Sequence, residues 1–149
     1  MNKDSRNYIE KKEISKTKDV IVLRTNFNDD ILWEKLCELI SEPNKEYGYK
    51  AYVEFVNNIG HNDIEQNAIT DLLVKAGYDH LIVFVVDDIT FQHKDSPILC
   101  IDLYEKTDNS FRVIPSEMWS VENNLSISNM DFEDFTDSLD SEGIFRGFE

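Results

Sequence analysis

Apolar residues recur along this chain with two different spacings, which change from one segment to the next. Compact, β-branched runs over residues 20–27 and 80–86 are typical of strands buried on both faces. Residues 51–56 alternate apolar and polar positions, which predicts a strand with one partly exposed face. Two further runs, 97–104 and 111–114, predict a pair of strands close together in the chain.

Four other segments have the apolar spacing of amphipathic helices. The first is predicted to begin after an N-cap at Asn28 and to end before Pro43. The second is predicted to open at Asn62, with Glu65 at capping-box spacing. The third begins at Pro115, a residue suited to a first helical turn. The fourth, near the C-terminus, has an apolar stripe formed by Phe132, Phe135 and Leu139.

The order of these elements predicts an α/β fold: strand, helix, strand, helix, then three strands and two helices. Strands separated by helices indicate right-handed crossovers, whereas adjacent strands indicate an antiparallel hairpin. We therefore expect one domain over residues 19–149, with helices packed on a mixed sheet of about five strands and the 80–86 strand at its centre. Residues 1–18 are mostly charged and polar and predict a mobile arm.

Two charged residues interrupt otherwise apolar strands, Arg24 in the first and Asp102 in the fourth. A buried carboxylate must be paired or protonated, so we predict a structural ion pair between them. In the hairpin, a two-residue loop at Asp108-Asn109 would place Glu105 opposite Arg112.

The charge of the chain is strongly acidic and unevenly distributed. Its 149 residues include 30 acidic and 15 basic ones, and residues 1–18 hold six of the basic and three of the acidic residues. Residues 19–149 therefore carry a net charge of −18. Such a domain repels phosphate backbones and anionic lipids, which disfavours direct binding to nucleic acids or membranes. Two interpretations of the acidity remain, namely simple solubility and attraction to a basic partner.

Cysteine usage and hydropathy predict a cytoplasmic protein. Cys37 and Cys100 fall at apolar positions of predicted elements, which favours two reduced core thiols over a disulfide. No N-terminal apolar segment resembles a signal peptide, and no apolar run approaches the roughly 18 residues of a membrane span. The chain has five glycines and no glycine-rich phosphate loop, so no cofactor is predicted.

Parts of the sequence resemble a known family. They are residues 23–30, residues 102–105 and, above all, residues 111–135, which contain the run Trp-Ser-Val-Glu-Asn-Asn-Leu; the closing Gly-Ile-Phe-Arg-Gly-Phe is equally specific. Together they resemble a small acidic bacterial domain family of unknown function that is frequent in actinobacterial genomes. The resemblance covers about residues 20–148. It implies a bacterial, intracellular, single-domain protein and identifies no functional residue.

The C-terminal helices provide the first candidate site. In the helix from Pro115, an inward apolar stripe leaves Trp119, Glu122 and Asn123 on another face. A large aromatic beside a carboxylate and an amide is typical of a recognition surface. Alternatively, Trp119 packs against the Phe-rich C-terminal residues while the amides cap or bridge loops. Acidic residues lie opposite the apolar stripe of the last helix and extend this candidate surface: Asp131, Glu133, Asp134, Asp137 and Asp140.

The end of the 80–86 strand provides a second, weaker candidate. Asp87 and Asp88 follow that strand, where ligands bind in open α/β sheets, and His93 lies in the same loop. Two carboxylates and an imidazole can bind a divalent cation. However, their spacing matches no established metal motif, and aspartate after a strand is commonly a turn residue.

These candidates lead to one expected function and two alternatives. No nucleophile–base pair can be identified, so we expect a non-catalytic protein-binding module, similar to immunity, antitoxin or adaptor proteins, that presents its acidic C-terminal surface to a basic partner. One alternative is a metal-assisted hydrolase that uses Asp87, Asp88 and His93 together with Glu117. The other is a nucleic-acid mimic whose carboxylates occupy a DNA-binding protein.

Overall fold

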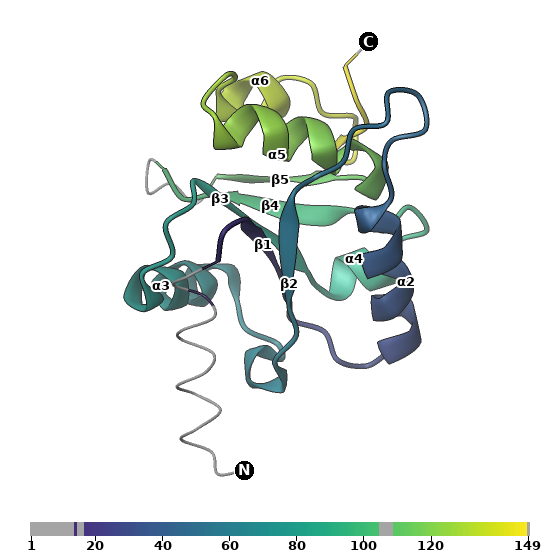
Figure 1. Cartoon of the computed structure of the whole chain (residues 1–149). Coiled ribbons are helices and arrows are strands. Elements are labelled where there is room, and N and C mark those ends of the chain that lie inside the picture. The colour runs from purple at the N-terminus through teal and green to yellow at the C-terminus, as the bar shows by residue number, and fades with distance from the viewer. Residues whose placement is uncertain (1–13, 15–16, 105–108, 149) are drawn as a thin grey trace.

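The computed structural model describes residue 14 and residues 17–104 and 109–148. This part of the chain forms a single α/β domain with six strands and five α-helices (Figure 1). The strands are β1 (Val20–Arg24), β2 (Val53–Val56), β3 (Ile82–Val86), β4 (Ile98–Asp102), β5 (Ser110–Val113) and β6 (Ile144–Phe145). The α-helices are α2 (Asp30–Ser41), α3 (Gln66–Ala76), α4 (Asp88–Gln92), α5 (Met118–Ser126) and α6 (Phe132–Thr136). Two 3₁₀ turns are η1 (Ile59–His61) and η2 (Pro115–Glu117).

The sheet is mixed, in the order β2-β1-β3-β4-β5-β6. Strand β1 pairs in parallel with β2 and β3, while β4 joins β3 and β5 by antiparallel pairing. The predicted fold class and the central position of β3 are confirmed. The sequence analysis missed α4 and β6. Strand β6 contains only two residues, paired in parallel with β5, and so short an element has no periodicity to recognise.

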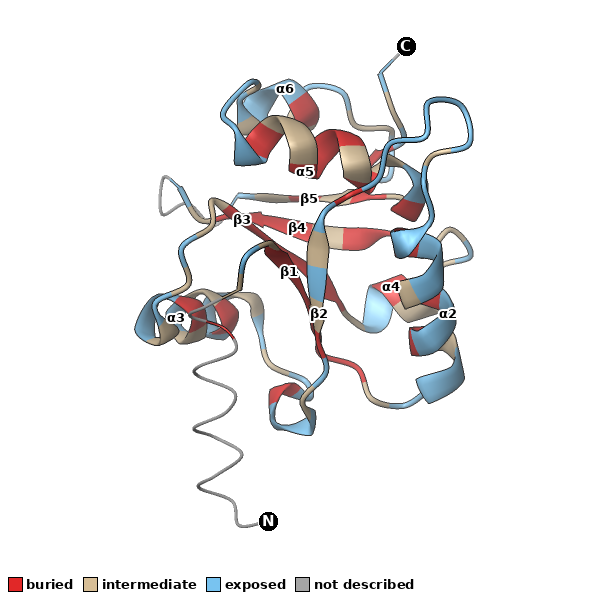
Figure 2. Ribbon diagram, viewed as in Figure 1, coloured by how far each residue is buried: buried red, intermediate tan, exposed pale blue. Residues whose placement is uncertain are grey.

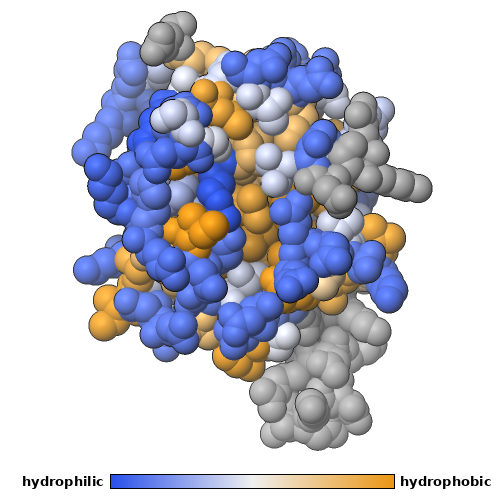
Figure 3. Space-filling model, turned by 180° about the vertical axis from the view of Figure 1, so that it is seen from behind, coloured by the Kyte–Doolittle hydropathy of each residue, from blue (hydrophilic) through white to orange (hydrophobic). Residues whose placement is uncertain are grey.

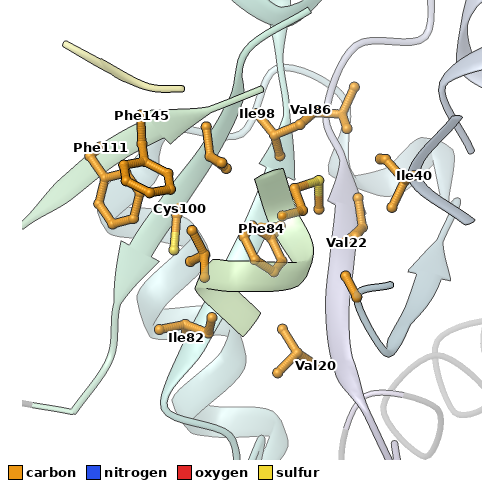
Figure 4. Packing of buried hydrophobic residues seen from close by; sticks show 14 of the residues in the cluster. Val20, Val22, Ile40, Ile82, Phe84, Val86, Ile98, Cys100, Phe111 and Phe145 are labelled. Carbon is orange, nitrogen blue, oxygen red and sulfur yellow. The ribbon is translucent and has the colours of Figure 1, made fainter. Parts of the chain in front are cut away.

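Helices cover the sheet on both faces, which explains the continuous apolar runs in its central strands. Every residue of β1 and β3 is buried (Figure 2). On one face, a row of four residues crosses four neighbouring strands at matched register: Val22, Phe84, Cys100 and Phe111. Their cluster, part of which is drawn in Figure 4, also receives residues of α2, α5 and α6. On the other face, Ile69 and Leu73 of α3 pack against Ile21, Leu23, Val83 and Val85.

Phenylalanine side chains attach the C-terminal residues to the sheet. Phe135 of α6 is fully buried and stacks on Phe111 of β5, with ring centroids 5.8 Å apart. Its ring also meets Phe145 of β6 at 5.0 Å and Phe148 at 5.3 Å. The segment after α6 is therefore part of the core, and its two-residue strand is held by aromatic packing as well as by its pairing with β5.

The helix starts differ from those predicted. Asp29, not Asn28, is the N-cap of α2, because its side chain accepts a hydrogen bond from the Leu32 N–H at 2.9 Å. Helix α3 begins at Gln66 rather than Asn62, because η1 precedes it and the Asp63 N–H bonds to the Thr25 carbonyl. Pro115 opens η2, which continues into α5.

The predicted ion pair between Arg24 and Asp102 is wrong. Arg24 lies at the end of β1, level with Val86, whereas Asp102 pairs with Ile82 at the opposite end of β3. The antiparallel direction of β4 separates the two charges. Arg24 instead forms an ion pair with Asp30 at 2.9 Å.

The predicted hairpin register is also wrong for Arg112, which lies opposite Leu99 in β4. Glu105, its expected partner, lies outside the described residues. A change in loop length moves every cross-strand pair, and loop length could not be read from the turn residues alone.

Most of the arm predicted over residues 1–18 lies outside the described residues. Within the described part, Ile14 is only 1% exposed and packs in the cluster beneath α3. The carbonyl of Thr17 lies 3.0 Å from Nε2 of His80.

Both cysteines have free thiols in the structure. Burial raises the pKa of Cys37 to about 11, and burial also raises the pKa of Cys100 well above its usual value. Within the described ranges, no helix has both the length and the apolar character needed to cross a bilayer.

The aromatic packing predicts that Phe135→Ala destabilises the domain by about 3–5 kcal/mol, because truncation leaves a cavity among three other rings. Urea unfolding followed by circular dichroism measures the change. Ile127→Ala is the control, since Ile127 is 75% exposed and should change stability by less than about 0.5 kcal/mol. A loss below about 1 kcal/mol for Phe135→Ala would show that this cluster does not hold the C-terminal residues.

Candidate functional site

The carboxyl end of β3 is organised around an ion pair between Asp87 and Arg112. The Arg112 guanidinium on β5 donates from Nη1 and Nη2 to the two carboxylate oxygens of Asp87, at 2.9 and 2.7 Å. Nη1 also donates to the Pro97 carbonyl at 3.2 Å. Asp87 caps α4 through a reciprocal capping box with Thr90. One carboxylate therefore connects β3, α4 and β5.

The ion pair keeps Asp87 in its charged form. Burial raises the pKa of this carboxyl group, but the hydrogen bonds and positive charge of Arg112, together with the bonds from Thr90, outweigh burial and hold the pKa below its usual value. A carboxylate that is ionised at neutral pH and has both oxygens bonded to one guanidinium serves primarily a structural role.

The three residues of the metal alternative have separate partners. Asp87 bonds to Arg112, the Asp88 carboxylate accepts from the Asn26 amide at 2.7 Å, and His93 Nε2 lies 2.9 Å from the Glu142 carboxylate. Among the residues that the structure describes, no three His, Cys, Asp or Glu side chains are grouped as metal ligands.

A groove of about 810 Å³ lies beside this ion pair. It is lined by residues that follow the parallel strands β1, β2 and β3, among them Thr25, Asp63 and Asp88. Its lining also includes residues of β3, β4 and α3. Figure 3 shows the molecule from behind, relative to Figure 1. This face has apolar surface at its centre, with hydrophilic side chains around it.

A second feature is a cluster of three aromatic rings, here called the aromatic surface: Tyr47, Tyr49 and Trp119. The two tyrosines belong to the loop 42–52 between α2 and β2, and Trp119 lies in the first turn of α5. Ring centroids are 6.0 Å apart for the stacked tyrosines and 5.3 Å apart for Tyr49 and Trp119. Tyr47 and Tyr49 are 58% and 55% exposed, so the cluster lies at the surface.

Glu122 and Asn123 hold this loop against α5. The Glu122 carboxylate accepts a hydrogen bond from the Tyr52 N–H at 2.6 Å, and the Asn123 amide donates to the Lys50 carbonyl at 3.2 Å. Glu122 is only 6% exposed. The expectation that it lies on an outer, partner-facing surface is therefore wrong, because the loop covers that face of the helix.

The acidic residues of the C-terminal segment lie away from Trp119 along α5. Asp131, Glu133, Asp134 and Asp137 are exposed, as their position opposite the apolar stripe predicted. Asp131 and Asp134 form the capping box of α6. Helix α6 lies beside the later part of α5, whereas the loop 42–52 reaches the beginning of α5 (Figure 1). The single predicted surface is thus two separate regions.

The carboxylates close to the aromatic surface are Glu46 and Glu117. Burial raises the pKa of Glu117, and the negative charge of Glu46 raises it further. The Tyr47 hydroxyl shares a hydrogen bond with Glu46, which raises the pKa of the tyrosine. Two carboxylates that repel one another beside exposed rings form a region of negative potential at the start of α5.

The sequence analysis missed Tyr47, Tyr49 and Arg112 as candidate residues. The tyrosines had a local signal, because the run Tyr47-Gly48-Tyr49 puts two aromatics around a residue with φ of +75° in a surface loop. Glycine adopts that conformation readily, so the loop can turn back toward α5. Arg112 had no local signal, because its partner is 25 residues earlier in the chain.

The ion pair predicts that Asp87→Asn lowers the free energy of unfolding by about 2 kcal/mol at pH 7. The folded-state pKa of Asp87 lies below its ordinary value of 3.8. The ionised form therefore stabilises the fold above that value, and this contribution is lost as the pH falls through the folded-state pKa. Urea unfolding should show that the difference from the wild type stays constant from pH 7 to about pH 4 and shrinks at lower pH.

The control for this prediction is Asp95→Asn. Asp95 pairs with Arg146, but both side chains are about one third exposed, so the expected loss is below about 1 kcal/mol. A deficit of Asp87→Asn that stays constant below about pH 4 would contradict an ionised, paired Asp87.

Comparisons with known proteins support a family assignment. A search of curated proteins finds no match for the chain. A family model matches residues 19–148, close to the range over which the sequence resembles a family of unknown function. With nearly the whole chain matched, this protein belongs to the family described as Domain of unknown function (DUF6924).

Proposed function

We propose that this protein is a non-catalytic binding module of the cytoplasm that recognises a basic partner protein through its aromatic surface. The observation that carries the proposal is the cluster of exposed Tyr47 and Tyr49 on half-buried Trp119, whose loop is held by Glu122 and Asn123. Two free cysteine thiols favour a reducing compartment.

The geometry of the aromatic surface is suited to an anchor. Tyrosine and tryptophan are enriched among residues that dominate binding energies, since they bury a large area at little entropic cost. Two side-chain hydrogen bonds join the loop to α5, so the rings are arranged before a partner arrives. A surface that is already ordered loses less conformational entropy on binding.

Charge supports a basic partner. Glu117 and Glu46 stand beside the rings, and no cation in the described part of the chain forms an ion pair with Glu117. A guanidinium or ammonium group can stack on the exposed rings and neutralise these carboxylates. The net charge of −18 over residues 19–149, including the exposed acids of α6, would steer a basic partner toward the domain.

The two alternative functions receive less support. The hydrolase alternative needs four residues around one metal ion, namely Asp87, Asp88, His93 and Glu117. The first three have different protein partners, and Glu117 lies beside the aromatic surface. The nucleic-acid mimic needs carboxylates in a regular, continuous row. The exposed acids of α6 and the Glu46–Glu117 pair instead occupy different parts of the surface.

The proposal predicts that Tyr49→Ser abolishes capture of the partner. The full chain, immobilised, is incubated with lysate of the native host, and retained proteins are identified by mass spectrometry. The expected partner is a basic protein, and its affinity for purified Tyr49→Ser should fall about 30-fold or more in a calorimetric titration, as for other aromatic anchors.

Tyr52→Ser is the matched control, because Tyr52 is 56% exposed and lies in the same loop outside the three-ring cluster. Its ring already contacts the Lys50 ammonium, 5.7 Å from the centroid. We expect a change below about threefold for this variant. Equal losses in the two variants, or a captured partner that is acidic, would refute the assignment of the aromatic surface.

A further inference from the structure

We infer that a second copy of this chain pairs with the edge strand β2, in antiparallel orientation and around a twofold axis at Tyr52. This inference goes beyond the proposed function and uses none of the three rings of the aromatic surface, because the paired residues are 50–54 of each copy. It depends on an open row of backbone groups and on a lysine and a glutamate that complement each other across the axis.

The two edges of the sheet differ. At the β6 edge, the Asp140 carboxylate accepts a hydrogen bond from the Ile144 N–H, and the Asp140 N–H donates to the Ile144 carbonyl, both at 3.0 Å. Asp140 thus closes that edge. At the other edge, β2 pairs with β1 and with no other strand of the described residues. Figure 1 looks onto β2, with α2 and α3 to either side of it. An open edge is a template for pairing with another chain.

The direction of the β1 backbone groups decides which groups of β2 are open. The Thr25 N–H bonds to the Val86 carbonyl, just past the ends of β1 and on the side of β3. The Ile21 N–H bonds to the Tyr78 hydroxyl, which donates to the carbonyl of Ile82 in β3. Backbone groups alternate in direction along a strand. The odd-numbered residues of β1 therefore face β3, and the even-numbered ones face β2.

This alternation turns the backbone groups of Val53 outward. Val22 faces β2 and is level with Phe55. In a parallel ladder, such a residue bonds to the two residues on either side of its partner, here Glu54 and Val56. The N–H and C=O groups of Val53 and Phe55 therefore point away from β1, to the open edge.

The residues just before β2 continue the pattern. Side chains of α5 bond to the Tyr52 N–H and to the Lys50 carbonyl, so these groups face the domain. The groups of Ala51, which lies between them, face the open edge. Together with those of Val53, they offer two N–H and two C=O groups on each copy. Antiparallel pairing around Tyr52 joins them in four hydrogen bonds.

The side chains on the exposed face of this segment are self-complementary. Lys50, Tyr52 and Glu54 lie on one face, since side chains alternate along an extended chain, and all three are exposed. Around an axis at Tyr52, Lys50 of each copy lies directly opposite Glu54 of the other. Moving the axis to residue 54 would instead place two Glu54 carboxylates opposite one another, which is unfavourable. The charges thus favour one register and a second copy as the partner.

Neither charge has an ion-pair partner within the described part of the chain. The Lys50 ammonium lies 5.7 Å from the centroid of the Tyr52 ring, and the Glu54 carboxylate accepts a hydrogen bond from the Asp19 N–H at 3.3 Å. Both side chains therefore remain available to a second copy.

The small size of this surface implies a weak, reversible dimer. A standard interface has about 20–30 residues a side, many more than the segment 50–54. The net charge of −15 also opposes association, although about 0.15 M salt screens charges more than about 8 Å apart. We expect a monomer–dimer equilibrium between about 10 µM and 1 mM protein.

The first test is sedimentation velocity of the full chain over this range in about 0.15 M NaCl. The expected result is conversion of monomer to dimer without larger species, because a twofold contact is closed. A chain that is monomeric at about 1 mM would overturn the inference and leave the edge to a strand of another protein. Larger oligomers would overturn it as well.

Charge reversal at the two facing positions tests the pairing itself. Glu54→Lys and Lys50→Glu each place like charges opposite one another twice in the dimer, and each should weaken dimerisation about tenfold or more. An equimolar mixture of the two variants restores a lysine opposite each glutamate, with the same total charge as two wild-type chains. We expect the mixture to dimerise about as well as the wild type. A mixture that associates no better than the single variants would overturn the inference.

Glu133→Lys is the matched control, because it makes the same change of charge at an exposed position on α6. Both Glu→Lys substitutions lower the general repulsion between two acidic chains, so weaker association of Glu54→Lys identifies the β2 edge. Glu133→Lys should not weaken dimerisation by more than about twofold. Equal effects of the two substitutions would assign the association to a different surface.

Discussion

The two halves of this domain depend on the forked ion pair between Arg112 and Asp87. The parallel half, β2-β1-β3, ends at Asp87, and the antiparallel half, β4-β5 with β6, carries Arg112. Arg112 reaches past β4 to bond both oxygens of Asp87 and the Pro97 carbonyl that precedes β4. A one-residue slip of β5 would turn Arg112 to the opposite face of the sheet, so the pair strongly favours the observed register.

The same interaction shapes the chemistry of the groove. Arg112 and Asp87 both line the groove, and the charge of the guanidinium is neutralised there by the carboxylate. The aromatic surface is a separate feature at the start of α5. Its loop is held against the helix by hydrogen bonds with the side chains of Glu122 and Asn123. The domain therefore presents a groove beside the ion pair and, apart from it, a surface with two exposed tyrosine rings.

The pattern of apolar positions in the sequence predicted those features of the fold that depend on local periodicity. The fold class and central β3 followed from continuous apolar runs, since a strand covered on both faces must be apolar throughout. Strand β6 was missed because two residues are too few to show a periodicity. Glu122 was predicted to be exposed because the helical repeat cannot show that a loop 70 residues earlier in the chain covers it. Trp119 was identified by residue type, whereas Tyr47 and Tyr49 join it only through that loop.

The most direct test of this account is a double-mutant cycle on the forked ion pair. Asp87→Asn, Arg112→Met and the double variant are unfolded in urea at pH 7, and the coupling energy is the non-additive part of the stability changes. The account predicts a coupling of about 2 kcal/mol, because both groups are largely buried and each single change leaves a polar partner without its charge. Additive changes, with a coupling below about 0.5 kcal/mol, would contradict the claim that this pair joins the two halves of the sheet.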